Sequence, residues 1–389
     1  MRAYVWTDKS LTRHAGRFVW LSLDMEKAQN ATARKQLGIS AFPTFYVVDP
    51  SDGHVALRWL GGMSLAQLER ILDDGELAVK GGGQGPALEA LIAADRAYGA
   101  EKHAEACDQY LRALAAAPAN WPAYGRAVES LMFAYSQADS LEPSLRAADA
   151  AWPKLRGTPS AATVAALALD AATELPDSVP GRAAALERYE AACREVLTDP
   201  KLSLTGDDRS GIYFSLESAR EAVHDSAGVR KLQDEHLAML EDYAARATTA
   251  EQRATYDSHR LSLYIELGKP QAAVPMLQQS RKDFPEDYNP PQRLATAYKS
   301  MKQWPDALAA SDVALPLAYG PRQFLVLNTR ADIQLGMADT TAAKATLTDA
   351  LAKAEKMPEG LKSPGTIRSL KGRLEKLGVK PTETAAAPR

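Results

Sequence analysis

The feature that most constrains the fold is a regular spacing of about 34 residues in the C-terminal third of the sequence. Gly268, Lys302 and Gly336 follow one another at equal intervals of this length. A fixed period of this kind is typical of stacked helix pairs, because one pair alone cannot bury its apolar face. We therefore expect three such units over residues 257–355, each with a helix, a short turn and a second helix.

Small residues and one proline support this spacing. Ala273 and Ala307 are separated by one such interval, and Pro285 closes the first unit. Two departures affect single boundaries: Thr341 stands where Ala is expected, and no Pro stands at the expected place after Ala314. The repeat is still predicted, because small residues recur where two helices must approach closely.

Residues 87–118 carry the same kind of pattern once, near the start of the helical part. Small residues let two helices approach, a tyrosine and flanking leucines fill the space between them, and a proline closes the second helix. The pattern residues are Ala94, Ala106, Tyr110, Ala113 and Pro118. Together with the later units, this stretch resembles the tetratricopeptide repeat (TPR), in which helix pairs stack into an all-helical solenoid.

The middle of the chain, residues 121–255, fits helix pairs without keeping a strict period. Turn-rich stretches at 176–181 and 198–208 interrupt it. We therefore assign 87–256 to divergent TPR-like repeats and 257–378 to TPR repeats. The resemblance implies a curved array whose concave face binds a protein or peptide partner.

Two segments lack the pattern of a folded element. Residues 79–86 are Gly-rich and predict a flexible linker. A phosphate-binding loop is the poorer interpretation, because no strand precedes the glycines and no Lys-Ser or Lys-Thr follows them. The tail, residues 379–389, is expected to be disordered.

The N-terminal segment, residues 1–78, has a different organisation, in which strand and helix patterns alternate. The expected order is helix, strand, helix, strand, strand, helix. The elements are a helix over 1–15, a strand over 18–24, a helix over 28–37 with Gly38 as its C-cap, a strand over 39–49 that begins through Pro43, a turn over 50–53, a strand over 55–60, and a helix over 65–72 capped by Ser64 and Gln67.

Short motifs make this order specific: VWLSLD at 19–24, GISAFPTF at 38–45, DPSDG at 49–53 and WLGG at 59–62. With them, residues 1–78 resemble the C-terminal part of a thioredoxin-like domain. The resemblance implies a multi-domain protein, with a partial α/β thioredoxin-like domain before the all-α repeats.

The resemblance also implies a binding groove. It places a cis proline at Pro43, with Phe42, Pro43 and Thr44 lining a groove where an extended substrate peptide pairs. From the residues alone, Pro43 could simply block strand pairing at the start of the strand.

A redox motif that the resemblance implies is missing. A C-x-x-C should precede the helix over 1–15, and none is present, so we expect no catalytic residue in this chain. The family's sheet also places one more strand between the segments at 18–24 and 44–49, and its loss leaves backbone groups without partners. We therefore interpret Met1 as an internal start within a longer protein. The alternative is a degenerate domain that only binds.

Composition excludes some classes of function. The net charge of −3 gives no support to a general nucleic-acid or anionic-membrane role. No apolar run approaches the roughly 18 residues that a membrane span requires. Relatives with this architecture are often bacterial, and the compartment stays open between periplasm and cytoplasm, as does the oligomeric state.

Other reactive side chains are predicted to be structural. Cys107 and Cys193 lie in Ala-rich helical patterns, which favours buried thiols over a disulfide or a reactive thiol. The six histidines form no metal motif. Acidic neighbours of His236 predict a solvated helix face, and Asp24 either caps a turn or lies near the groove. No metal or cofactor is predicted.

Two functions follow from these observations. The first is a thiol-disulfide oxidoreductase-like protein whose repeats bind a partner, present here without redox cysteines. The second is a non-catalytic protein–protein interaction scaffold. Both predict that this chain has no dithiol activity.

Overall fold

The computed structural model describes residues 4–37, 39, 42–80 and 85–379. The chain divides into two compact units. The first comprises Met1–Phe18 and Gly38–Arg246, and the second comprises Val19–Leu37 and Ala247–Arg389. Residues 19–37 thus group with the C-terminal repeats, whereas the rest of the N-terminal segment groups with the helices that directly follow it.

A β-hairpin forms the first part of the first unit. Strand β1 (Thr44–Val48) pairs antiparallel with β2 (Val55–Leu60), with Thr44 opposite Leu60. In the turn, the Asp49 carboxylate accepts a hydrogen bond from the Ser51 amide at 2.8 Å. The predicted hairpin is confirmed, but its first strand is shorter than the expected 39–49.

Helix α2 (Leu65–Val79) packs on this hairpin. Ser64 and Gln67 form the predicted capping box, and the helix continues beyond the expected end at residue 72. Gly75 permits the close approach, because a Cβ at that position would lie 2.5 Å from the Val47 side chain.

The prediction of one long helix over residues 1–15 was wrong. Among the described residues, Tyr4–Thr7 form turns and the 3-10 helix η1 (Lys9–His14) follows. Asp8 starts η1 by accepting a hydrogen bond from the Ser10 amide at 2.8 Å, which breaks any longer helix at this point. Tyr4, Val5 and Leu11 from this stretch pack in the core of the hairpin and α2.

The strand predicted over residues 18–24 was also wrong. The sheet in the described part of the chain has two strands, and Val19 and Leu21 are 89% and 77% exposed. A strand needs a neighbour for its backbone N–H and C=O groups, and the strand that the thioredoxin-like sheet places beside this segment was expected to be missing. A thioredoxin fold is therefore not confirmed, and what forms is a two-stranded sheet with helices.

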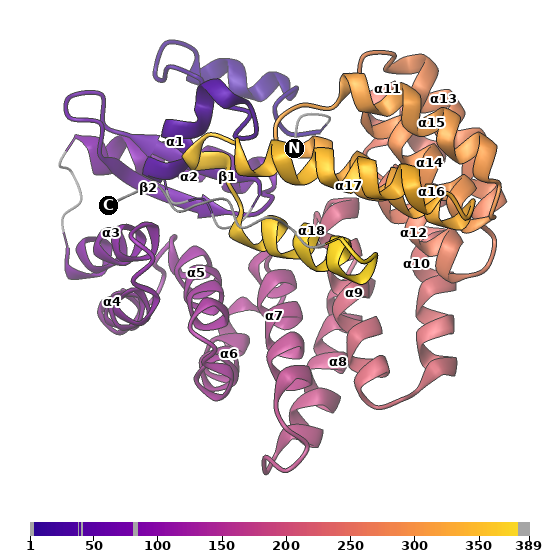
Figure 1. Cartoon of the computed structure of the whole chain (residues 1–389). Coiled ribbons are helices and arrows are strands. Elements are labelled where there is room, and N and C mark those ends of the chain that lie inside the picture. Colours follow the sequence, from indigo (N-terminus) through magenta and orange to yellow (C-terminus); the bar gives the residue numbers. More distant parts are fainter. Residues whose placement is uncertain (1–3, 38, 40–41, 81–84, 380–389) are drawn as a thin grey trace. The chain divides into compact units, whose positions relative to one another are not determined.

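Antiparallel helix pairs make up the rest of the first unit (Figure 1). Consecutive helices pack together, and α5, α7 and α9, the first members of their pairs, also contact one another. The buried residues Ala94, Ala106, Tyr110 and Ala113 confirm the first predicted repeat. The helices are α3 (Pro86–Gly99), α4 (His103–Ala116), α5 (Tyr124–Gln137), α6 (Leu141–Leu155), α7 (Ser160–Glu174), α8 (Arg182–Thr198), α9 (Gly206–Ala222) and α10 (Ser226–Arg246).

A buried polar cluster joins the hairpin to the first helices. The Arg126 guanidinium on α5 donates to the Asp95 carboxylate at 2.8 Å and to the Arg58 carbonyl on β2 at 3.0 Å. The Tyr110 hydroxyl donates to Asp95 at 2.8 Å. Leu60 packs into the core that α3, α4 and α5 form. The sheet and the first repeats are therefore packed together, although most of the predicted linker, residues 81–84, lies outside the described residues.

The second unit contains the three predicted repeats (Figure 1). Residues 19–37 add η2 (Ala28–Asn30) and α1 (Ala31–Leu37), close to the helix expected over 28–37. Gly38, its expected cap, lies outside the described residues. The remaining elements are α11 (Ala250–Ala254), α12 (Asp257–Glu266), η3 (Pro270–Ala272), α13 (Ala273–Asp283), α14 (Asn289–Ser300), α15 (Trp304–Leu317), α16 (Arg322–Gly336), α17 (Thr340–Glu355), η4 (Glu359–Leu361) and α18 (Pro364–Lys376).

The spacing of these repeats differs from the expected period in the third unit. Ala273, Ala307 and Ala343 are all fully buried, so Ala343 and not Thr341 is the third small residue. The turns show the same shift, because Gly268, Lys302 and Ala338 are their left-handed residues.

The third unit is therefore longer by two positions. Gly336, which suggested the period, ends α16 and does not form the turn. The interval from the buried Ala314 to the buried Ala350 is longer than the interval from Ser280 to Ala314. The buried Phe324 is already displaced by two positions relative to the preceding repeat. The extra positions therefore fall between Ala314 and Phe324, next to the loop between α15 and α16.

Candidate functional site

The loop between α15 and α16, residues 318–321, is the centre of the candidate site. It connects the second and third repeats of the C-terminal unit and carries the exposed Tyr319. Gly320 has φ +50°, a left-handed conformation that suits glycine. Arg322 begins α16 directly after the loop. Two pockets adjoin this loop, and Tyr319 lines both of them.

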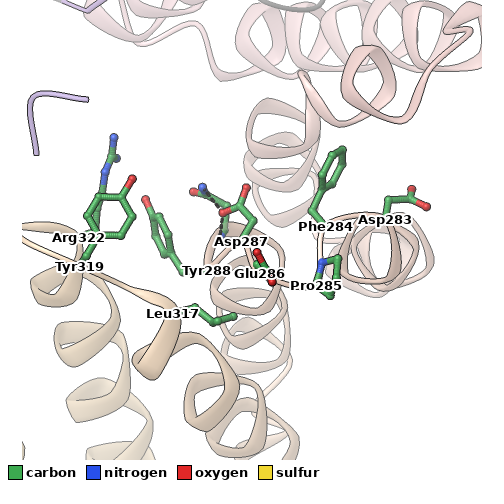
Figure 2. A pocket seen from close by; sticks show the side chains of 10 residues that line it. Asp283, Phe284, Pro285, Glu286, Asp287, Tyr288, Leu317, Tyr319 and Arg322 are labelled. Atoms are coloured by element: carbon green, nitrogen blue, oxygen red, sulfur yellow. Dashed lines mark hydrogen bonds between the residues drawn. The ribbon is translucent and has the colours of Figure 1, made fainter. Parts of the chain in front are cut away.

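The first pocket has a volume of about 550 Å³ and combines aromatic with acidic side chains. In Figure 2, Arg322, Tyr319 and Tyr288 lie towards one end and Phe284 and Asp283 towards the other. The Arg322 guanidinium lies 6.0 Å from the centre of the Tyr288 ring, within range of a cation–π contact. The lining residues are Asp283, Phe284, Pro285, Glu286, Asp287, Tyr288, Asn289, Leu317, Tyr319 and Arg322.

The second pocket has a volume of about 710 Å³ and is basic. It has three lysines and no acidic residue in its lining. Three of its residues come from the segment 19–37, so this pocket forms only where that segment meets the repeats. The lining residues are Lys27, Ala28, Gln29, Tyr319, Gly320, Gln323, Lys353, Lys356, Met357, Pro358 and Leu361.

Acidic side chains of the N-terminal segment contact the loop. The Tyr319 hydroxyl donates a hydrogen bond to the Asp24 carboxylate, although the two residues are 295 positions apart in the sequence. Arg322 forms an ion pair with Glu26. The Lys27 ammonium lies 5.6 Å from the centre of the Tyr319 ring. These residues thus hold a folded stretch of chain against the loop, a turn at residues 25–27 that leads directly into η2.

The contact between Asp24 and Tyr319 shifts both pKa values. Burial alone would raise the pKa of Asp24, but hydrogen bonds from the Tyr319 hydroxyl and the Glu26 amide hold that pKa below its ordinary value. The hydrogen bond to Asp24, together with burial, raises the pKa of Tyr319 to about 12. The Glu26 amide donates to Asp24 at 3.0 Å, so Asp24 caps the following turn, which was one of its two predicted roles.

Two glycines bring the backbones of the two partners together. The Cα of Gly320 faces the Glu26 carbonyl oxygen, and the Cα of Gly360 in η4 faces the Ala31 carbonyl oxygen. At either position a Cβ would overlap that oxygen. The surface therefore accommodates the main chain of residues 24–31 as well as its side chains.

The groove residues predicted from the sequence lie in the first unit. Phe42 is 61% exposed, Pro43 is exposed, and Thr44 is half-buried at the start of β1. The Phe42–Pro43 peptide bond is cis, as the resemblance implies. The Pro43 carbonyl accepts a hydrogen bond from the Gly61 amide at 2.9 Å. Their role in binding a peptide stays a prediction.

Both cysteines are buried and free, as predicted. Burial raises the pKa of Cys107 to about 11, and burial together with nearby carboxylates raises that of Cys193 well above its ordinary value. A thiol with a raised pKa is a poor nucleophile at neutral pH. These two residues therefore do not provide a reactive dithiol.

The predicted solvated face around His236 was wrong. His236 is fully buried, with its ring stacked on Tyr213 at 4.8 Å. Its Nε2 lies 2.9 Å from the Ser210 hydroxyl and its Nδ1 lies 3.1 Å from the Glu217 carboxylate. Ser210 is 1% exposed, so a substrate carbonyl cannot reach its hydroxyl. This group is a polar contact between α9 and α10, not a hydrolytic site.

Among the residues that the structure describes, one group of side chains offers metal-ligating atoms. Asp49, Asp52 and His54, in the hairpin turn, place three such atoms within 4.8 Å of one another. Asp49 instead accepts hydrogen bonds from Ser51, and Asp52 pairs with His54. Exposed turn carboxylates with partners of their own do not by themselves make a metal site.

The first helices of the C-terminal pairs share a charged cluster. Lys299 on α14 contacts Asp332 on α16 at 3.0 Å. Arg373 on α18 contacts Asp332 at 2.6 Å and donates to the Asn328 side chain at 2.7 Å. The cluster thus connects α14, α16 and α18.

Sequence reasoning missed most of the candidate site. It identified Asp24 but not Glu26, Tyr319 or Arg322. The missing proline after Ala314 was the available signal, because it marks the place where the interval between repeats becomes longer.

The fold defines a class of protein: the chain is mostly helical, built of TPR-like helix pairs with a small two-stranded sheet near its N-terminus. In the part that the structure describes, no helix is long and apolar enough to cross a membrane.

Comparisons with known proteins add little to this. No family model and no curated protein matches the chain. One solved structure, "TPR2AB-domain:pHSP90-complex of yeast Sti1", covers 75% of this chain and 98% of that one. It shares 15% identity with a TM-score of 0.29, a likeness too low to carry an argument.

Proposed function

We propose that this protein is a non-catalytic interaction protein whose helix pairs bind a short peptide segment of a protein partner. The observation that supports it best is the loop between α15 and α16. Side chains and backbone of this loop hold residues 24–31 through Tyr319, Gly320 and Arg322. A surface that holds one short segment of the chain has the groups needed to hold another.

The concave face of the repeats is proposed as a second surface for the same partner. The cluster of Lys299, Asp332 and Arg373 on α14, α16 and α18 supports this, since charged side chains there can pair with a peptide's own charges. Helical repeats commonly use such extended faces for protein binding.

A peptide library displayed against the full chain tests this function. We expect selection of a sequence motif rather than of unrelated apolar peptides. Binding of the selected peptides should weaken at least tenfold in Arg322→Ala or in Arg373→Ala. Arg146→Ala, which alters an exposed pair with Glu142, is the matched control. Absence of any selected motif, or binding that is equal in all variants, would contradict the proposal.

The thiol-disulfide role that the resemblance implies is a second candidate. The hairpin, helix α2 and the exposed side chains of Phe42 and Pro43 support a peptide groove, with Thr44 beside them. Cys107 and Cys193 do not support redox chemistry, since both are buried.

Turnover of insulin by this chain separates the two candidates. We expect no reduction of insulin disulfides, and measurable reduction would favour the thiol-disulfide role. The groove is tested separately: Phe42→Ala should weaken peptide binding if the groove contributes, whereas exposed Val48→Ala at the other end of β1 serves as control.

A further inference from the structure

We propose that residues 24–31 are an internal ligand of the C-terminal repeats, and that the surface they cover recognises acidic peptides of the pattern Asp–apolar–Glu. The chain's own segment then competes with a partner peptide of the same pattern. This inference rests on the proposed peptide-binding function and names the chemistry of its ligand.

The pattern follows from three successive residues. Asp24 meets the Tyr319 hydroxyl and Glu26 meets the Arg322 guanidinium, so two carboxylates two positions apart each find a donor. Met25, between them, is 8% exposed and is the buried residue of the stretch 19–37, all of which the structure describes. One buried apolar residue between two paired acids is thus the shortest pattern that this stretch presents.

The backbone contacts explain how the turn at residues 25–27 and the helical residues after it fit against the repeats. Gly320 and Gly360 leave space for the carbonyl oxygens of Glu26 and Ala31. Because these contacts involve main-chain atoms, any peptide with the same backbone path can make them. Only the acidic side chains and the apolar anchor then select the sequence.

The composition of the contact makes the segment displaceable. Apart from Met25, residues 19–37 are half-buried or exposed. The Arg322 side chain is 46% exposed and that of Glu26 is 17% exposed, so solvent and salt reach this ion pair from the Arg322 side and screen it. A packed core does not exchange in this way, because most of its stabilisation comes from buried apolar surface.

The neighbouring pocket extends the preference for acidic ligands. Lys353 and Lys356 of the repeats line the basic pocket beside Tyr319, next to Lys27 of the segment. Lys356 is exposed, whereas Lys353 pairs with Asp349 at 2.7 Å. A partner peptide with a further acidic residue beyond its Glu would place that charge near Lys356.

Paired glycine variants test whether the segment docks in solution. Gly360→Ala adds a Cβ that meets the Ala31 carbonyl, whereas Gly372→Ala in α18 adds one into open space. Gly320→Ala and Gly268→Ala form a second pair, since both have positive φ but only Gly320 faces the segment. Amide exchange of residues 24–37 should accelerate at least tenfold in Gly360→Ala and Gly320→Ala and stay unchanged in their controls. Equal exchange in all four variants would overturn the docking.

A labelled peptide tests the competition. A fluorescent peptide with the sequence of residues 22–34 is titrated with the full chain at low and high salt. The doubly neutralised chain, Asp24→Asn with Glu26→Gln, should bind it at least tenfold more tightly than the wild type, whose site is occupied. Adding Arg322→Ala to that chain should remove the gain, and so should neutralising both acids in the peptide.

The outcomes separate this inference from the proposed function. Equal binding of the peptide by wild type and doubly neutralised chain, or binding that ignores Arg322, overturns the internal ligand. Selected library peptides that still bind in that case leave the general peptide-binding function standing. Circular dichroism and thermal unfolding of each variant identify any change that results from misfolding.

Discussion

The ring of Trp304 lies directly against the Cα of Gly336, so closely that a Cβ there would come within 2.5 Å of the ring. Trp304 begins α15 and Gly336 ends α16. The contact therefore joins the second and third repeats of the C-terminal unit.

Gly336→Ala is expected to destabilise this unit, although alanine usually favours a helix. The added methyl must displace a large rigid ring, which costs about 1–3 kcal/mol. Gly372→Ala in α18 meets nothing within 4 Å and should instead stabilise by about 0.5–1 kcal/mol. Urea unfolding of both variants measures the difference, and equal shifts would contradict the packing described.

Removing Arg126 should be far more damaging than removing an exposed arginine. Arg126→Ala leaves the buried Asp95 carboxylate without its guanidinium partner, which costs about 3–5 kcal/mol. Arg146→Ala removes an exposed pair and should change the free energy of unfolding by about 0.5 kcal/mol or less. Chemical denaturation followed by circular dichroism decides between the two expectations.

The contact between Asp24 and Tyr319 should be present only within a window of pH. The pKa of Asp24 is lowered in the folded state, so its contribution is present above the ordinary aspartate pKa and is lost as the pH falls through the lowered value. The pKa of Tyr319 is raised to about 12, so its contribution is present below the ordinary tyrosine pKa and is lost as the pH rises through about 12.

Anisotropy of a fluorophore attached at Gln29→Cys measures this window. High anisotropy is expected from about pH 4 to about pH 10, the ordinary values of the two groups, with a decrease beyond each end. Tyr319→Phe removes the hydrogen bond and should flatten both transitions. If the transitions persist unchanged in that variant, they arise from the titration of other groups.

Cys107 and Cys193 should resist thiol reagents in the folded protein. Burial raises the pKa of both thiols, so the thiolate is scarce at pH 8. Reaction with a disulfide reagent should be at least a hundredfold slower in the native chain than in urea. Rapid stoichiometric reaction under native conditions would show that one of the thiols is accessible.

Local sequence signals predicted the parts of the fold that local interactions determine. The capping residues Ser64 and Gln67 act within one helical turn, and the hairpin turn around Asp49 needs only its own residues. The small residues Ala273 and Ala307 also gave the repeat, because the same packing demand recurs in each unit.

The failures have a shared physical reason, which is dependence on distant groups. A strand over 18–24 requires a neighbouring strand that local sequence cannot supply. His236 looked exposed because acids flank it, yet Leu232 and Leu240 lie one helical turn to either side and place it on the buried face of α10. The partner of Asp24 lies 295 positions away, and no local pattern brings the two together.

The two additional positions beside the loop between α15 and α16 show that a repeat protein can meet two requirements separately. One is the packing of the helix stack, and the other is recognition by the residues that connect its helices. The buried alanines before and after them keep their packing, so the stack of helices tolerates the longer interval between repeats. The connection itself carries Tyr319 and the left-handed Gly320. Recognition can therefore diverge, in nature or by design, through insertion at a single inter-repeat connection, while the core that supports it stays unchanged.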